Sequence, residues 1–564
     1  MPESANNYDW AEFEAAAEAD SLLDTPRGEE LRARREAVKS AFSYSWAGYR
    51  RYAWNHDELL PVTNRHGDSR NGWGASAIDA LSTAIIMDLP DVVDQILEFV
   101  PSIDFTTTRT SDPVSLFETT IRYLGGLISG YDLLRPGTGP RDPPGPRARM
   151  TKKTALVNKL LTQAISLADA LSFAFDPSIT PSGIPFNDLD FKGKKPFESD
   201  GRKQERNTLA TVGTLVLEWT RLSDLVGDPK YANLAQRAQD FLLRPKSSFA
   251  RNMPCKAAKP SCEVWDGLVA SEVFIANGTF APVGGSWMGG ADSFYEYLIK
   301  MYVYDSRSFK FYADRWVAAA ESTRKFLSSK PVTRPDLTFL AAWAPDGRLI
   351  KHSQHLACFA GGNFILGGQV LKNDDYIKYG LELVNGCRQT YEATNTKIGP
   401  DYFVWDETNV PADQADFFKK NGFYFRGNKA YLLRPEVIES YYYAYRVTRE
   451  QKYQDWAWDA FIHIRNATLA ESGYTAIQDV MDAGMLDTSA KNKDYRYHPS
   501  RSFNEQESFW FAEVLKYSYL IQSDGDDAFQ IPRGHGNIYN AGRRKNFWVF
   551  NTEAHPVRVR GPPV

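Results

Sequence analysis

Several acidic residues in the sequence stand beside groups that could tune their acidity. Glu118 lies four residues before Arg122, so a helix would place both side chains on one face. Asp292 follows the glycine-rich stretch 289–291 at an expected helix start, where free backbone N–H groups stabilise an anion. Asp292 is therefore either a helix cap or a catalytic carboxylate, and the spacing leaves both interpretations open.

Two further acidic motifs lie towards the end of the chain. Pro435 is expected at a first helical position, followed by Glu436 and Glu439 one turn apart. Glu513 follows Phe509 by one turn in an aromatic segment. Each carboxylate alone would usually be an ion pair or a cap. Together they suit glycoside hydrolysis, in which a carboxyl group with a raised pKa protonates the leaving oxygen and an ionised one activates water.

The segment 547–556 differs from the helical sequence before it. Residues 547–550, Phe-Trp-Val-Phe, have strand character. Asn551, Thr552, Glu553 and His555 follow directly, and all can bind a cation or a sugar. We hypothesise that the helical body surrounds this segment and that its Thr-Glu end forms the floor of an active site.

The elements that must position these residues are repeated helical hairpins. Segments 218–231, 296–311 and 439–453 each end one helix, turn, and begin another. Such hairpins stack into an open solenoid or a closed ring, and the terminal strand favours a ring because an open array offers it no place. A first helix is expected over about 29–54, and insertions at 188–205, 244–262 and 398–425 are expected to line one mouth of the ring.

Composition narrows the functional classes. The 564 residues carry a net charge of -4 with a pI near 6.1, which argues against a nucleic-acid partner. No apolar stretch is long enough to predict a membrane span. Residues 1–7 show neither the basic region nor the apolar stretch of a signal peptide, which taken literally predicts a cytoplasmic chain. By contrast, two glycosylation acceptors, Asn277 and Asn466, and an even number of cysteines fit secretion.

Other chemistries find little support in the residues. The sequence has no Gly-x-Ser-x-Gly motif for a serine hydrolase. Cys255 and Cys262 lie in a loop without a nearby histidine, which fits a small disulfide or free thiols better than zinc. His355 and Cys358 stand in an apolar context typical of a hydrogen-bonding core histidine and a core cysteine.

An ordered set of motifs resembles glycoside hydrolase family 47, the class I alpha-1,2-mannosidases, and most of all its secreted fungal members. The resemblance runs from about residue 45 to residue 556. It is carried by Asn71-Gly-Trp-Gly-Ala, Asp79-Ala-Leu, Phe117-Glu-Thr-Thr-Ile-Arg, Asp292-Ser-Phe-Tyr-Glu, His355-Leu-Ala-Cys, Leu433-Arg-Pro-Glu-Val-Ile-Glu, Glu507-Ser-Phe-Trp-Phe-Ala-Glu and Asn551-Thr-Glu-Ala-His-Pro.

The resemblance implies an all-α fold, an (α/α)7 barrel of helical hairpins plugged by a C-terminal β-hairpin. Residues 1–564 would form one catalytic domain, with 1–28 as a lead-in and 546–564 as the plug. The implied activity is a calcium-dependent, inverting, exo-acting hydrolysis of terminal alpha-1,2-linked mannose. High-mannose oligosaccharides and glycoproteins would be the substrates, and the enzyme is expected to be a secreted monomer.

The same resemblance implies roles for individual residues. Glu118 would be the general acid, acting through a water, and Glu436 the general base, with Asp292 as its rival. Thr552 would bind Ca²⁺ through its carbonyl and hydroxyl oxygens. Further substrate-binding residues would be Arg122, His355, Arg434, Glu439, Phe509, Glu513 and Glu553. Cys358 and Cys387 match the disulfide of the family, and Cys255 with Cys262 would add a second one.

One departure from the family bears on specificity. Members that remove a single mannose carry an arginine two residues before the motif aspartate, where this chain has Gly290. The smaller residue predicts a wider cleft and the removal of several alpha-1,2-linked mannoses. The alternatives are a lectin-like protein on the same barrel and an endo-acting enzyme that releases a disaccharide.

Overall fold

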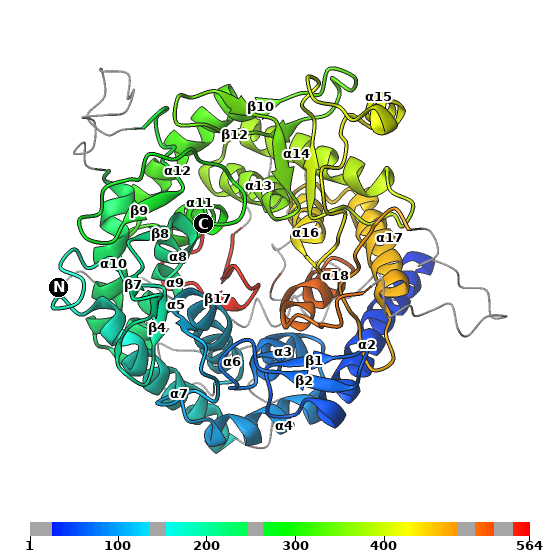
Figure 1. Cartoon of the computed structure of the whole chain (residues 1–564). Coiled ribbons are helices and arrows are strands. Elements are labelled where there is room, and N and C mark those ends of the chain that lie inside the picture. Colours follow the sequence, from blue (N-terminus) through cyan, green and yellow to red (C-terminus); the bar gives the residue numbers. More distant parts are fainter. Residues whose placement is uncertain (1–24, 136–153, 246–262, 483–501, 524–528, 530–544) are drawn as a thin grey trace.

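Seven pairs of packed helices form a closed ring in the part of the chain that the structure describes (Figure 1). This computed structural model describes residues 25–135, 154–245, 263–482, 502–523, 529 and 545–564. The inner helices are α3 (Ala75–Ile86), α6 (Gly125–Leu134), α9 (Val216–Val226), α11 (Asp292–Tyr304), α13 (Phe359–Leu371), α16 (Glu436–Thr448) and α18 (Leu515–Leu520). Their outer partners are α4 (Pro90–Phe99), α7 (Thr154–Leu171), α10 (Lys230–Leu243), α12 (Lys310–Ser322), α14 (Asp374–Glu392), α17 (Gln451–Thr468) and α2 (Pro26–Tyr52). The predicted all-α (α/α)7 barrel is therefore confirmed.

Burial distinguishes the two rings of helices. Every residue of α3 is buried, and α13 is buried from Phe359 to Val370, because inner helices contact neighbours on all sides. Outer helices such as α10 bury one stripe only, as expected of amphipathic helices that face solvent. The turns between an inner helix and its outer partner contain residues with a left-handed backbone conformation. Gly227 ends α9 and Arg449 ends α16 in this way.

A two-stranded hairpin lies inside the ring near its centre (Figure 1). Strand β16 (Trp548–Phe550) pairs antiparallel with β17 (Pro556–Arg558). All three residues of β16 are buried, and the side chains of Phe550 and Trp548 lie against Phe529. The predicted apolar plug is thus a hairpin whose tip carries residues 551–555.

Buried polar groups hold the hairpin tip in place. Lys516 Nζ donates to the carbonyl of Ala554 at 2.6 Å, and His555 Nε2 lies 3.1 Å from Asp79 Oδ1. The Asn551 side chain donates to the Ile121 carbonyl at 2.9 Å and to a Glu218 carboxylate at 2.8 Å. The tip therefore contacts several inner helices at once, which fixes its position relative to the barrel.

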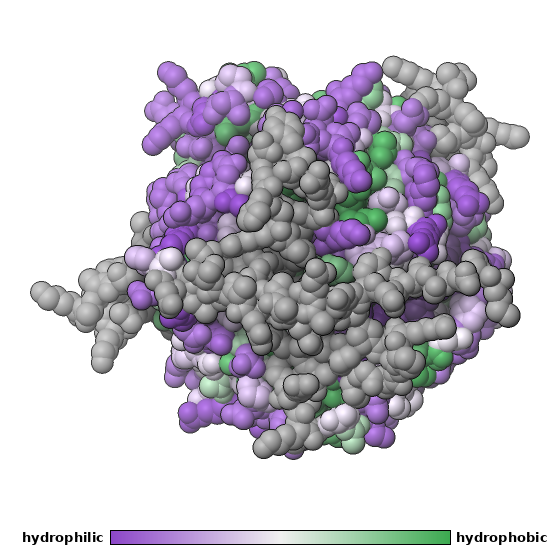
Figure 2. Space-filling model, turned by 180° about the vertical axis from the view of Figure 1, so that it is seen from behind, coloured by the Kyte–Doolittle hydropathy of each residue, from purple (hydrophilic) through white to green (hydrophobic). Residues whose placement is uncertain are grey.

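Some element boundaries differ from the prediction. The first helix begins at Pro26 rather than near 29, because Thr25 caps it with a side-chain hydrogen bond to the N–H of Gly28. No helix among the described ranges is long and apolar enough to cross a membrane. The coloured surface in Figure 2 is mostly hydrophilic with smaller hydrophobic areas, as expected when the apolar side chains line the barrel interior.

Candidate active site

The three predicted catalytic carboxylates lie at or near the starts of inner-ring helical segments. Glu118 ends the short helix α5 (Leu116–Glu118), whose N-cap Ser115 accepts from the Glu118 N–H. Asp292 is the first residue of α11 and Glu436 the first residue of α16. Because inner helices that run in the same sense begin at the same end of the barrel, these carboxylates share one mouth.

The structure decides between the two interpretations of Asp292 left open above, and it contradicts one prediction, the position of Pro435. The N-cap of α11 is Ala291, and the Asp292 carboxylate accepts from the N–H of the next residue, Ser293, at 2.8 Å. Asp292 is therefore not the helix cap. Pro435 is the N-cap of α16 rather than its first helical residue, since Glu436 already begins the helix.

Arg122 links two of the predicted site carboxylates. Its Nε donates to Glu118 at 2.7 Å, and its Nη1 donates to Ser508 at 3.0 Å and to Glu553 at 3.2 Å. Burial raises the pKa of the Glu118 carboxyl, but Arg122 and Arg70 outweigh it, and the pKa ends below its ordinary value. Glu118 is thus held as an anion in this charge environment.

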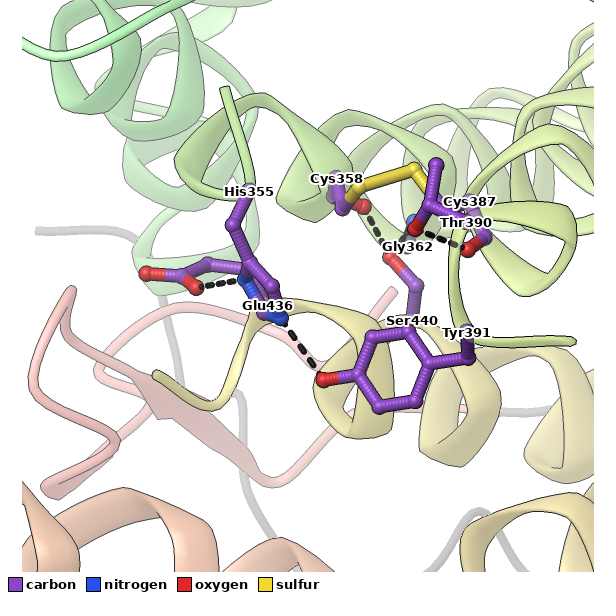
Figure 3. The surroundings of a disulfide bond; sticks show 8 residues. All are labelled: His355, Cys358, Gly362, Cys387, Thr390, Tyr391, Glu436 and Ser440. Carbon is purple, nitrogen blue, oxygen red and sulfur yellow. Dashed lines mark hydrogen bonds and ion pairs between the residues drawn. A yellow bond between two sulfur atoms is a disulfide. The ribbon is translucent and has the colours of Figure 1, made fainter. Parts of the chain in front are cut away.

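Glu436 is bonded to a buried histidine (Figure 3). Its Oε2 lies 2.7 Å from His355 Nδ1, and His355 Nε2 lies 2.7 Å from the Tyr391 hydroxyl. Burial would raise the pKa of Glu436, but the hydrogen bond and charge of His355, together with Arg434, leave the pKa below its ordinary value. Glu436 is ionised at neutral pH, as a general base must be.

Asp292 has the opposite electrostatic surroundings. Burial raises its pKa to about 7, with Glu296 and Glu436 contributing, despite hydrogen bonds from Ser293 that lower it. Carboxyl groups whose environments push their pKa values apart are typical of acid–base pairs in enzymes. Asp292 and Glu436, whose pKa values are shifted in opposite directions, are candidates for such a pair.

A second set of carboxyl groups lies deeper in the barrel. Burial raises the pKa values of Glu439, Glu513 and Glu553 above their ordinary range, and carboxylate neighbours add to the effect. Glu553 neighbours Thr552 at the hairpin tip, and Glu439 lies one turn below Glu436. The structure thus brings the predicted substrate-binding carboxylates to the inner surface of the barrel.

Thr552 offers two oxygens to a cation. Its N–H donates to the Tyr297 hydroxyl at 3.1 Å, but no described residue donates a hydrogen bond to its carbonyl or hydroxyl oxygen. The carboxyl group of Glu553 follows directly in the chain, so the hairpin tip offers oxygen atoms, the ligands that a hard cation such as Ca²⁺ prefers. The residues present therefore fit the predicted ion.

The remaining predicted residues, Arg434 and Phe509, lie close to Glu436 and Arg122. Arg434 Nε donates to Asp401 Oδ1 at 2.5 Å and lies close enough to lower the pKa of Glu436. Phe509 is buried, with the Arg122 guanidinium 5.4 Å above its ring. The aromatic ring of Phe509 thus provides the apolar surface near the carboxylates that sugar binding requires.

A disulfide joins Cys358 to Cys387, as the family resemblance implies (Figure 3). Cys358 lies three residues after His355, and its carbonyl accepts from Ser440 on α16, one turn after Glu436. The disulfide therefore fastens the segment that carries His355 to α14, and the Ser440 hydrogen bond holds it beside the helix that carries Glu436. Cys255 and Cys262 lie outside the described residues.

Sequence reasoning missed several polar partners of the site. Arg70 lies 3.6 Å from Glu118, Asp401 pairs with Arg434, and Tyr391 completes the chain of bonds from Glu436. Only Arg70 had a local signal, since it precedes the expected turn at 71–74. The rest approach from distant segments and leave no mark in local spacing.

Two π-helical turns were also not expected. One spans Thr119–Leu124 directly after Glu118, and the other spans Trp510–Val514 and contains Glu513. A π-turn shifts the side chains after it around the helix axis and is frequent at functional sites. Both turns redirect site residues in the inner ring.

Comparison with known proteins agrees with this geometry. A family model described as glycosyl hydrolase family 47 matches residues 41–559. The chain is 52% identical to a mannosyl-oligosaccharide alpha-1,2-mannosidase of Coccidioides posadasii, over 93% of this chain and 91% of that protein. It is 50% identical to the mannosyl-oligosaccharide alpha-1,2-mannosidase 1B of Aspergillus oryzae, over 94% of this chain and 93% of that protein.

A solved structure agrees as well. The alpha-1,2-mannosidase from Trichoderma reesei superposes with a TM-score of 0.82 at 44% identity, covering 94% of this chain and 99% of that one. Family, sequence and fold therefore lead to the same assignment. The chain is a glycoside hydrolase and belongs to glycosyl hydrolase family 47.

Proposed function

We propose that this enzyme is a mannosyl-oligosaccharide alpha-1,2-mannosidase that acts from the non-reducing end, inverts the anomeric centre and depends on calcium. The relatives described above are named mannosyl-oligosaccharide alpha-1,2-mannosidases. The match extends over most of this chain and most of each relative, which supports the same activity here. The single observation that carries the proposal is Thr552 at the tip of the central hairpin, beside the buried Glu553, with two oxygens that accept no hydrogen bond from the described residues.

Calcium would supply a fixed positive charge that orients sugar hydroxyl groups above the hairpin tip. Thr552 would hold the ion directly, and Glu439, Glu513 and Glu553 would hold its waters and the sugar. Phe509 would lie against the apolar face of the sugar ring. This arrangement positions one terminal mannose with its glycosidic bond towards the mouth, which supports exo action.

At the mouth of the barrel, one residue accepts a proton from water and another donates a proton to the leaving group. Glu436, ionised beside His355, takes a proton from the attacking water. Proton donation is assigned to Glu118 through a bridging water. Asp292, the rival of Glu436 for the role of general base, is also a candidate for the donor. Electrostatics favour Asp292 as a donor, because its pKa is raised to about 7 whereas that of Glu118 is lowered.

Substrate breadth and location complete the proposal. Gly290 has a φ of 88°, and an added Cβ there would meet only Thr208, at 3.8 Å, so the cleft is open at the position where single-mannose enzymes carry arginine. We expect several alpha-1,2-linked mannoses to be removed from a nine-mannose glycan.

Secretion of the enzyme is supported by the disulfide and by the exposed glycosylation acceptor Asn277.

The test is release of mannose from Man-alpha-1,2-Man by the purified enzyme. Activity should disappear with a chelator and return with Ca²⁺, and β-mannose should appear first by NMR. Thr552→Ala should weaken Ca²⁺ binding while the thermal midpoint without calcium changes little, and Thr162→Ala, on an exposed helix face, is the matched control. Sugar binding without hydrolysis would support the lectin alternative, and a disaccharide product from a longer glycan the endo alternative.

A second experiment assigns the proton donor. α-Mannosyl fluoride has a leaving group that departs without protonation. A variant that lacks the donor should therefore hydrolyse the fluoride far better than it hydrolyses the disaccharide, whereas Glu436→Gln should be inactive on both. Comparing Glu118→Gln with Asp292→Asn under these conditions identifies the donor directly.

A further inference from the structure

Two histidines and an aspartate meet beside the hairpin of β1 (Glu58–Leu60) and β2 (Arg65–Gly67), outside the carboxylate ring. The rings of His56 and His66 stack with centroids 3.5 Å apart and planes 15° from parallel. His56 Nδ1 lies 2.8 Å from Asp68 Oδ2. One nitrogen from each histidine and one Asp68 oxygen all lie within 4.8 Å of one another. Among the described residues this is the only group of three such side chains so close together.

The backbone fixes all three residues. The His56 N–H donates to the Ala53 carbonyl at 3.0 Å, and its carbonyl accepts from the Tyr49 hydroxyl at 2.7 Å. His66 lies in β2, where it pairs with Leu59 of β1. The Asp68 carboxylate accepts from the Asp57 N–H at 3.2 Å. The three side chains therefore come from a braced hairpin, and the reorganisation that binding requires is a rotation of the stacked imidazole rings about their side-chain bonds, which points one nitrogen of each ring at the ion.

We propose that His56, His66 and Asp68 bind a divalent transition-metal ion of the zinc class. Two imidazole nitrogens and one carboxylate oxygen are ligands that Zn²⁺ prefers, and a water would complete a tetrahedron. Ca²⁺ prefers oxygen ligands only, so this site is distinct in chemistry from Thr552. The side chains of His56 and Asp68 are 31% and 25% exposed, so an ion can reach them from solvent.

The site is connected to the catalytic mouth through the chain itself. Asp68 precedes Ser69, whose N–H and hydroxyl both donate to Glu58, and Arg70, whose guanidinium lies 3.6 Å from Glu118. An ion held at Asp68 fixes the end of the segment that presents Arg70.

The test is calorimetric titration of the calcium-saturated enzyme with Zn²⁺, with the visible absorption of bound Co²⁺ as a second readout. We expect one Zn²⁺ per chain and an increase in the thermal midpoint on binding. His66→Ala and Asp68→Asn should each weaken Zn²⁺ binding by at least about 10-fold. His463→Ala, which removes a histidine paired with a single aspartate, should leave it unchanged.

Two results would overturn the proposal. One is the absence of Zn²⁺ binding by the unaltered enzyme at neutral pH. The other is binding that both His66→Ala and Asp68→Asn leave unchanged, which would place the ion elsewhere. A cooperative thermal unfolding transition of each variant, measured without Zn²⁺, confirms that it is folded. Since the readouts are metal binding and stability, they do not depend on the proposed mannosidase activity.

Discussion

Replacing His355 by leucine tests whether Glu436 is the general base. His355 Nδ1 lies 2.7 Å from the Glu436 carboxylate and helps to lower its pKa. A hydrogen bond to a charged group contributes about 1.5–3 kcal/mol, and one pKa unit corresponds to about 1.36 kcal/mol. Removing it should therefore raise the pKa of Glu436 by about 1–2 units. A base works only when ionised, so activity should be lost at higher pH than in the unaltered enzyme.

The assay is kcat/KM for mannose release over a series of pH values. The acid limb of the profile reports the pKa of the base in the free enzyme, and we expect it to move upwards by about 1–2 units in His355→Leu. His355→Gln, which keeps a donor without a charge, should give a smaller shift. Tyr391→Phe removes the other hydrogen bond of His355 and serves as the matched control.

An acid limb that stays in place while kcat/KM falls equally at every pH would refute the assignment of Glu436. His355 is buried, so its replacement also destabilises the fold. Thermal midpoints of all three variants, measured at each pH, separate loss of folded enzyme from a change in titration.

Three further predictions concern stability and specificity. Replacing Cys358 and Cys387 by alanine opens a loop of 29 residues, which should lower the free energy of unfolding by about 3.6 kcal/mol in denaturant titrations. Asp459 raises the pKa of the half-buried His463 above 6.5, so the pair stabilises the fold fully below pH 6.5 and loses this effect as the pH rises through the folded value. The loss of stability in His463→Ala should thus be about 1 kcal/mol or less at pH 5.5 and smaller at pH 8. Gly290→Arg should narrow the cleft and make trimming of a nine-mannose glycan stop earlier, at a stability cost of about 1–2 kcal/mol from the positive φ; an unchanged product series would contradict the role of this position.

Local sequence signals predicted the fold well, because each hairpin is encoded by nearby residues. The turn at Gly227 and the apolar strand 548–550 are both explained by local chemistry. The closure of the ring had no local signal, and the expectation of a ring rested on the terminal plug and the family resemblance. The π-turn at Thr119–Leu124 could not be predicted, since its backbone is stabilised by packing against neighbouring helices.

The sequence predicted the carboxylates of the site, but it did not predict the neighbouring groups that shift their pKa values. Glu118 and Arg122 are neighbours on one helical segment, so their contact follows from spacing. Arg122 reaches Ser508 and Glu553 across more than 380 residues of sequence, and no periodicity encodes such contacts. The direction of each pKa shift therefore required the three-dimensional structure.

The position of the hairpin in the chain has a consequence for synthesis. Residues 548–558 leave the ribosome after every described barrel helix, yet Thr552 and Glu553 belong to the proposed sugar-binding floor. A nascent chain could therefore form the helices that carry Glu118, Asp292 and Glu436 before this floor exists. On the proposed function, the sugar site would be completed last, when the tip docks against Lys516 and Asp79.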